Sequence, residues 1–164
     1  NYLTTKLLLD EMQNYFDIDD FTIVTESKDY RGRPYRSDFV TLIEKQNVHF
    51  EVFENEIIVS YFTDHVHFED YTSELSDSEP DYINRAIDFL KKLFTLRLKR
   101  YDYYKANKLL KDKYFFIKSD GTEEFIGGCW YGLVSFFNPF AKKKLIAAEW
   151  RFDKDKKCFD EYHI

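Results

Sequence analysis

The clearest pattern in the chain is an alternation of apolar and polar positions between residues 48 and 61. Six apolar residues lie at every second position on either side of the polar stretch 54–56: Val48, Phe50, Val52, Ile57, Val59 and Tyr61. A period of two predicts strands that bury one face. A tight turn at residues 54–56 would bring both apolar sets together on one core face. A third strand, or a bent continuation of the second, is predicted from His65 to Tyr71.

Apolar residues at three- and four-residue spacing predict two helices, at residues 5–16 and 80–94. Thr4 or Thr5 is expected to cap the first helix, because a hydroxyl can accept a hydrogen bond from the first backbone N–H groups. Pro80 suits the first position of the second helix, since its missing N–H is not needed there. Each helix would bury one apolar stripe against a sheet.

The rest of the chain reads mainly as short strands joined by turns. We expect the second helix to give way to a strand near Thr95, since a longer helix would far exceed the usual three turns. Gly32 and Pro34 predict a loop at residues 26–37. The last long strand is expected at residues 144–152, followed by a turn at residues 154–156 and a short strand at the end of the chain.

Two glycine-containing pairs predict local backbone features in the second half of the chain. Asp120-Gly121 is typical of a two-residue hairpin turn, which would place Lys118 opposite Glu123. Gly127-Gly128 lies within a predicted strand and indicates a bulge or a close approach of two backbones.

Strands that follow one another through short turns favour antiparallel pairing. We therefore predict an α+β protein, mainly antiparallel sheet in two meander-like segments packed by helices near 5–16 and 80–94. A length of 164 residues fits a single domain, 1–164, with possible pseudo-repeat halves 1–79 and 80–164. Aromatic residues make up 20% of the chain, against 5 Gly and 3 Pro, which also favours sheet.

The formal net charge is −6 at pH 7, but the charges are unevenly distributed. Residues 46–84 hold ten acidic residues and no Lys or Arg, whereas residues 85–118 hold eleven basic and three acidic residues. Either the two blocks fold side by side and neutralise each other, or the molecule presents a negative surface that steers a basic partner. The predicted partner-binding residues are Glu69, Asp70, Glu74, Asp77 and Glu79.

In size, acidity and α+β pattern the chain is similar to many small bacterial inhibitor proteins, including immunity proteins that neutralise partner toxins. We therefore expect a protein-binding module with a basic protein partner and no cofactor, rather than an enzyme. The sequence has no Gly-rich phosphate loop, dinucleotide fingerprint or Gly-x-Ser-x-Gly motif. The sequence has only two cysteines, no recognisable signal peptide and no apolar run long enough to cross a bilayer. We therefore predict a cytoplasmic protein with no membrane association.

Three histidines support the alternative function, a metal- or small-molecule-binding protein. His65 and His67 are two apart on a predicted strand, so both rings would lie on one face about 6–7 Å apart. His49 lies on the same polar face of the preceding hairpin. Neutral imidazole is a common metal ligand, so His49, His65 and His67 form a candidate metal site. The competing interpretation is a solvated face on which histidines happen to alternate.

Arginines beside tyrosines form a further candidate site, for anions. Arginine with aromatic neighbours suits phosphate or nucleic-acid contacts. Nucleic acid is nevertheless disfavoured as a partner, because nucleic-acid binders usually present a net basic surface and this chain is acidic. The arginines would instead pair with Asp29 and Asp38, although the basic block 85–118 keeps the option open. The candidate anion-binding residues are Arg31, Arg33 and Arg36.

Overall fold

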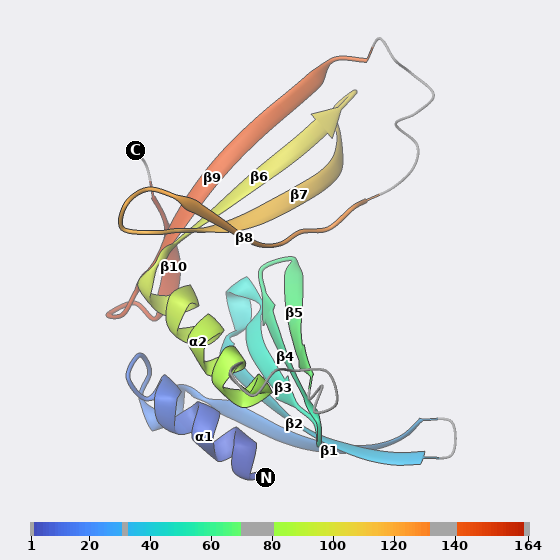
Figure 1. Ribbon diagram of the computed structural model, residues 1–164, viewed down its shortest axis with the longest axis vertical. Coiled ribbons are helices and arrows are strands. Elements are labelled where there is room, and N and C mark those ends of the chain that lie inside the picture. The colour runs from blue at the N-terminus through green and yellow to red at the C-terminus, as the bar shows by residue number, and fades with distance from the viewer. Residues whose placement is uncertain (1, 31–32, 70–80, 132–140, 163–164) are drawn as a thin grey trace. The chain divides into compact units, whose positions relative to one another are not determined.

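The computed structural model describes residues 2–30, 33–69, 81–131 and 141–162. Its helices are α1 (Leu3–Met12) and α2 (Tyr82–Thr95), with short 3-10 turns at Ile18–Asp20 and Glu44–Gln46. The strands are β1 (Thr22–Tyr30), β2 (Arg33–Ile43), β3 (Val48–Val52), β4 (Glu56–Tyr61), β5 (Asp64–Glu69), β6 (Arg97–Lys105), β7 (Lys108–Ile117), β8 (Glu123–Gly127), β9 (Lys143–Asp153) and β10 (Cys158–Glu161). The predicted α+β class with mainly antiparallel sheet is confirmed (Figure 1).

The chain divides into two compact units. The first unit holds residues 1–92 and 154–158, and the second holds residues 93–153 and 159–164. Sheet A, in the first unit, has the strand order β1-β2-β3-β4-β5, whereas sheet B has the order β10-β9-β6-β7-β8. The prediction of one domain with two pseudo-repeat halves stays a prediction. Within the described part of the chain, no helix combines the length and apolar content that crossing a membrane requires.

The hairpin predicted at residues 48–61 forms the centre of sheet A. Phe50 lies opposite Val59 across β3 and β4, and all six alternating apolar residues are fully buried. The Phe53 N–H donates a hydrogen bond to the Glu56 carbonyl at 2.8 Å, which closes the tight turn. The predicted register and core face are therefore confirmed.

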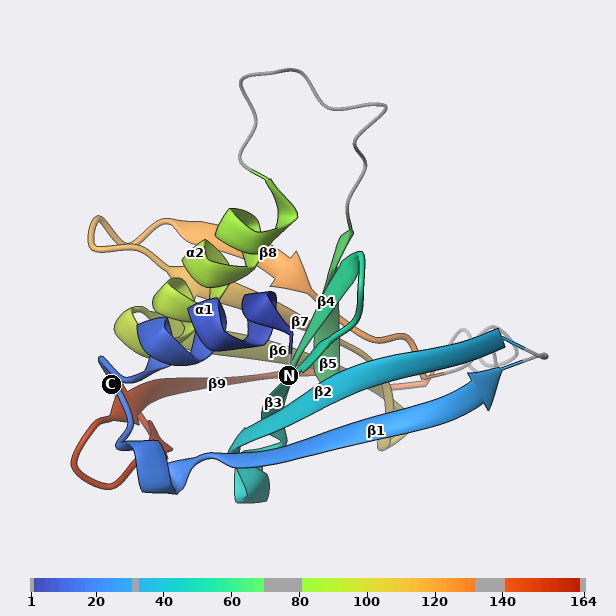
Figure 2. The same cartoon turned by 90° about the horizontal axis from the view of Figure 1, so that it is seen from below.

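The loop predicted at residues 26–37 is wrong, because residues 26–30 and 33–37 are paired strand residues of β1 and β2. β1 and β2 remain paired as far as Tyr30 opposite Arg33. Figure 2 shows this two-stranded ribbon continuing past β3, whose pairing with β2 begins only at Asp38. At Pro34, β2 is paired with β1 on one side and with no described strand on the other. Such an edge position tolerates proline, because its missing N–H interrupts no hydrogen bond on the unpaired side.

A buried carboxylate, that of Asp38 on β2, joins α1 to sheet A. It accepts hydrogen bonds from the Tyr2 N–H at 2.7 Å, the Thr5 hydroxyl at 2.8 Å and the Thr25 hydroxyl at 2.7 Å. Burial alone would raise the pKa of Asp38, but these hydrogen bonds outweigh it and hold the pKa below its ordinary value. Tyr2 is the N-cap of α1, so the predicted cap at Thr4 or Thr5 is wrong. The acceptor comes from β2 instead.

The second helix begins later than its apolar spacing predicts. Its first residue is Tyr82, and Asp81 caps it by accepting a hydrogen bond from the Asn84 N–H at 2.8 Å. The predicted first residue, Pro80, lies outside the described residues. α2 ends at Thr95 and is followed at once by β6, so the predicted change from helix to strand is confirmed.

The turn at Asp120-Gly121 connects β7 and β8 through a three-residue loop, in place of the two-residue turn predicted. The Lys118 N–H donates to the Thr122 carbonyl at 2.9 Å, and Glu123 lies opposite Ile117. The predicted pairing of Lys118 with Glu123 is therefore wrong. Gly121 has a φ of +84°, the left-handed conformation with which three-residue hairpin loops commonly end.

The close backbone approach predicted at Gly127-Gly128 is confirmed. A Cβ atom added to Gly128 would lie 2.4 Å from the Asp112 carbonyl oxygen on β7. Two hydrogen bonds hold the segments together, from the Asp112 N–H to the Cys129 carbonyl at 3.0 Å and from the Cys129 N–H to the Asp112 carboxylate at 2.7 Å. The Asp112 side chain is buried between these groups.

Replacing Gly128 by alanine should destabilise the second unit by about 1–3 kcal/mol, because the new methyl group overlaps the backbone of β7. Urea unfolding measures the loss. Gly121→Asn is the matched control, since a side chain there meets open space and asparagine tolerates the left-handed conformation. An alanine variant at Gly128 as stable as the wild type would show that the backbones are not in close contact.

Asp38→Asn should destabilise the first unit by about 1–3 kcal/mol, because buried donors lose an ionised acceptor. The lowered pKa of Asp38 means that the unfolded chain binds its proton more readily than the folded chain. The stabilisation by the ionised Asp38 is therefore fully present at a pH above the ordinary carboxyl pKa. It is lost as the pH falls through the lowered pKa that Asp38 has in the folded protein. Hydrogen exchange of α1 amides should show the loss, and the exposed Asp19→Asn should not. Unchanged protection in Asp38→Asn would contradict the role of this carboxylate.

Candidate functional site

Alternate residues of β3, β4 and β5 leave the core and line the outer face of sheet A. In register across this face, Ser60 lies opposite both His49 and His65, and Ile58 lies opposite His67. The structure therefore places all three predicted metal-site histidines on one face. His49 and His65 are separated by the intervening strand β4.

A carboxylate–histidine cluster forms where the outer face reaches the β3–β4 turn. Glu56 and Glu69 lie directly opposite each other, and one ligand atom from each, with a ring nitrogen of His67, all lie within 4.8 Å of one another. The Nδ1 atom of His67 contacts the Glu56 carboxylate. The side chains of His67 and Glu56 remain 44% and 29% exposed, so a ligand can reach them. We call Glu56, His67 and Glu69 the acidic cluster.

The three predicted histidines differ in their relation to the acidic cluster. The rings of His65 and His67 lie 5.0 Å apart between centroids, in an edge-to-face arrangement. The His49 ring packs at 4.5 Å against Phe39, and burial lowers its pKa although Glu51 acts in the opposite direction. Of the three predicted histidines, only His67 belongs to the acidic cluster; the His65 ring lies next to it, and His49 lies outside the cluster.

Glu56 is the member of the cluster that sequence reasoning missed. It immediately precedes the alternating residues of β4 and reads as part of the polar turn. Its position follows only from the pairing of β4 with β5, which sets Glu56 opposite Glu69 and Ile57 opposite Phe68. No local pattern in the sequence indicates that pairing.

A polar hollow of about 590 Å³ lies beside the acidic cluster. Two features of its walls matter for binding. Three glutamates line it, Glu54, Glu56 and Glu69, and so do Tyr35 and Phe53, whose ring centres lie 5.9 Å apart. Arg36 also reaches the hollow, and its guanidinium group lies 5.9 Å from the centre of the Tyr2 ring. The walls are therefore acidic and aromatic, with one arginine.

Most of the other predicted site residues cannot be placed. Four of the five predicted partner-binding residues lie outside the described residues: Asp70, Glu74, Asp77 and Glu79. The fifth, Glu69, belongs to the acidic cluster. Among the candidate anion-binding residues, Arg31 lies outside the described residues, Arg33 is described only by its backbone in β2, and Arg36 lines the polar hollow.

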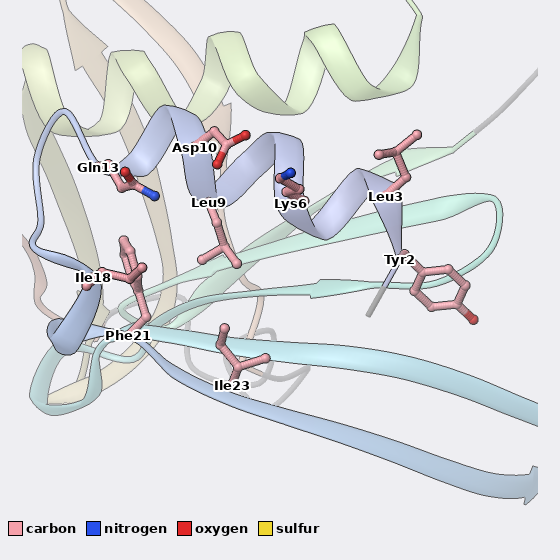
Figure 3. A pocket seen from close by; sticks show the side chains of 9 residues that line it. All are labelled: Tyr2, Leu3, Lys6, Leu9, Asp10, Gln13, Ile18, Phe21 and Ile23. Atoms are coloured by element: carbon pink, nitrogen blue, oxygen red, sulfur yellow. The ribbon is translucent and has the colours of Figure 1, made fainter.

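A second hollow in the first unit, of about 600 Å³, lies between α1 and the start of β1 (Figure 3). Its walls are mainly apolar and include Leu9 and Ile23, and Leu3 and Ile18 remain 75% and 70% exposed. One lysine and one aspartate at its rim leave it without a charge preference. The polar hollow, by contrast, gathers several carboxylates, so we treat it and the acidic cluster as the candidate functional site.

The chemistry of this site suits a cation. Carboxylate oxygens accept hydrogen bonds from ammonium and guanidinium groups, and aromatic faces attract the same groups. Two carboxylates and one imidazole also form a ligand set that suits a divalent transition metal. The chemistry of a lysine or arginine side chain and that of a divalent metal ion both match these residues.

Comparisons of the chain with protein-family models, with curated proteins and with solved structures find no match.

Proposed function

We propose that the protein is a binding module that captures a basic protein partner, as inhibitor and immunity proteins do. The observation that carries the proposal is the position of Glu54, Glu56 and Glu69 around one hollow at the end of sheet A. A lysine or arginine side chain of the partner would enter this hollow and pair with the glutamates.

The charge of the surrounding chain supports this proposal. Residues 46–84 contain ten acidic residues and no Lys or Arg, and Glu69 leads directly into the most acidic part of this block. Arg85 donates to the main-chain carbonyl of Glu69 at 2.9 Å, so that hydrogen bond does not use the Glu69 carboxylate. Arg36 offsets part of the negative charge. A net negative site steers a basic partner toward itself and disfavours acidic ones.

The aromatic walls add affinity to the charge. Tyr35 and Phe53 are fixed by packing against each other, so they lose little conformational entropy when a partner binds. The aliphatic stem of a lysine or the plane of an arginine packs on such rings while its charged end reaches a carboxylate. A few residues of this kind at the centre of an interface commonly supply most of the binding energy.

The proposal places the protein in a reducing compartment, the cytoplasm. Cys129 and Cys158 are both free thiols, as is usual for cytoplasmic proteins. The module acts by occupying its partner and carries out no chemical step. A bacterial source fits this type of inhibitor.

Replacing both Glu56 and Glu69 by glutamine should abolish capture of the basic partner, because the hollow loses two negative charges but keeps its shape. The protein is immobilised and incubated with a bacterial lysate, and retained proteins are identified by mass spectrometry. Retained proteins should be basic and should be released by added salt, since screening weakens the steering field.

The matched control removes two exposed carboxylates elsewhere in the first unit, in the variant Glu44→Gln with Asp19→Asn. It has the same net charge as the test variant and should retain the same proteins as the wild type. Proteins that bind all three forms equally, or that bind independently of salt, would refute the proposal.

A metal site is the second candidate function, favoured by the convergence of Glu56, His67 and Glu69 within 4.8 Å. Manganese, iron and zinc all accept ligand sets of carboxylate and imidazole. A bound ion would also neutralise the close carboxylate pair, which otherwise repels. In this reading His67 is essential, whereas capture of a basic side chain depends mainly on the two glutamates.

His67→Ala should abolish metal binding, whereas His49→Ala should leave it unchanged, because His49 lies outside the acidic cluster. Protein purified without a histidine tag or chelator is analysed for metal and then titrated with Zn²⁺ and Mn²⁺ by calorimetry. His65→Ala is a further control, since its ring neighbours His67 without belonging to the ligand set. Loss of metal in His49→Ala, or its full retention in His67→Ala, would rule out this ligand set.

A further inference from the structure

A third hollow, in the second unit, has the opposite charge to the candidate functional site. It has a volume of about 420 Å³ and lies on sheet B, between β6, β7, β9 and the segment after β8. Four lysines line it together with aromatic and leucine side chains, and most of its lining surface is apolar. We call this hollow the lysine cleft, and its lining includes Tyr103, Lys105, Lys111, Trp130, Lys143 and Lys144.

The strand register concentrates positive charge at this end of sheet B. Lys105 lies directly opposite Lys108 on one side and opposite Lys143 on the other. Like charges directly opposite in a sheet are destabilising, and a structural role would be better served by a mixed pair. Among the described residues, no carboxylate forms an ion pair with Lys143 or Lys144. The arrangement is costly for folding and suits an anion.

The aromatic rings of the lysine cleft are placed for stacking. The Lys111 ammonium group lies 4.7 Å from the Tyr103 ring centre and 5.4 Å from that of Trp130. Trp130 is held beside Lys111 by a backbone bridge, yet its side chain stays 58% exposed. A fixed and exposed tryptophan beside several lysines combines a flat apolar surface with positive charge.

The acidic residues near the cleft are engaged elsewhere. Asp102 and Asp112 both interact with Arg100, at 2.6 Å and 3.3 Å. The Asp112 carboxylate also accepts hydrogen bonds from the Cys129 N–H and the Tyr131 hydroxyl, each at 2.7 Å. These two carboxylates therefore neutralise Arg100, and that of Asp112 also holds the backbone at Cys129.

We infer that the lysine cleft binds a nucleotide unit, with its base on the aromatic rings and its phosphate on the lysines. Base stacking on aromatic side chains together with lysine contacts to phosphate is how proteins bind single-stranded nucleic acid. A hollow of this size accommodates one base and its phosphate, and small-ligand sites commonly fall in this range. The overall acidity of the chain argues against nucleic acid, but the local charge decides what this surface binds.

Either a single-stranded nucleic acid or a free nucleotide supplies this chemistry, and the inference is independent of the function proposed for the first unit. The test uses the full chain with Trp150→Phe, so that Trp130 is the only tryptophan. The protein is titrated with a ten-nucleotide oligothymidylate and, separately, with thymidine monophosphate. Quenching of Trp130 fluorescence reports stacking. Tighter binding of the oligonucleotide assigns a single strand, and equal binding assigns a free nucleotide.

Removing Lys143 and Lys144 together, as alanines, should weaken oligonucleotide binding about tenfold and lower its salt dependence by about 1.4 in logarithmic slope, because two phosphate contacts are lost. The matched control is Lys45→Ala with Lys154→Ala, which removes two exposed lysines of the first unit and should change neither quantity. Circular dichroism verifies that each variant is folded.

Four outcomes would overturn the inference. The first is that neither the oligonucleotide nor the mononucleotide quenches Trp130 fluorescence, and the second is that the test and control variants bind the oligonucleotide equally well. The third is that dextran sulfate, which has charge but no bases, binds as tightly as the oligonucleotide. The fourth is a response only to anionic phosphatidylserine vesicles. The last would assign a membrane surface in place of a nucleotide.

Discussion

The buried carboxylate of Asp38 connects three segments of the first unit that are distant in the sequence. Its hydrogen bonds with Tyr2, Thr5 and Thr25 fix the start of α1 against β1 and β2. Burial of apolar side chains supplies most of the stability of such a core, but it does not by itself select one position for a helix. A buried ionised group tolerates no shift that breaks its hydrogen bonds, so it sets that position.

The same core determines where the acidic cluster lies. Side chains alternate along a strand, so a shift of one residue in β4 would bury Glu56 and expose Ile57. The core-facing apolar side chains of β3 and β4 around Phe50 and Val59 are fully buried, and the shift would expose those of β4, so it does not occur. The outer face is thereby fixed, and pairing of β4 with β5 then brings Glu56 beside Glu69. The candidate functional site is thus a consequence of core packing on the opposite face of the sheet.

Features encoded by local patterns were predictable from the sequence. The alternation at residues 48–61 gave the central hairpin of sheet A, because period and burial agree there. Features that depend on distant partners were not predictable. Thr5 resembles a helix cap until Asp38 is seen to supply the acceptor, and Glu56 resembles a turn residue until Glu69 is seen opposite it. An Asp-Gly pair fits loops of two or three residues, so the pairing of Glu123 was ambiguous from sequence alone.

We propose that the acidic end of sheet A recognises a positively charged side chain. The most direct measurement is nuclear magnetic resonance of isotope-labelled protein titrated with a lysine-rich peptide at low salt. The carboxyl resonances of Glu56 and Glu69 and the ring resonances of His67 should shift together, while those of His49 should not. The shifts should disappear when salt is added. Peptide binding that leaves Glu56 and Glu69 unperturbed would contradict the account.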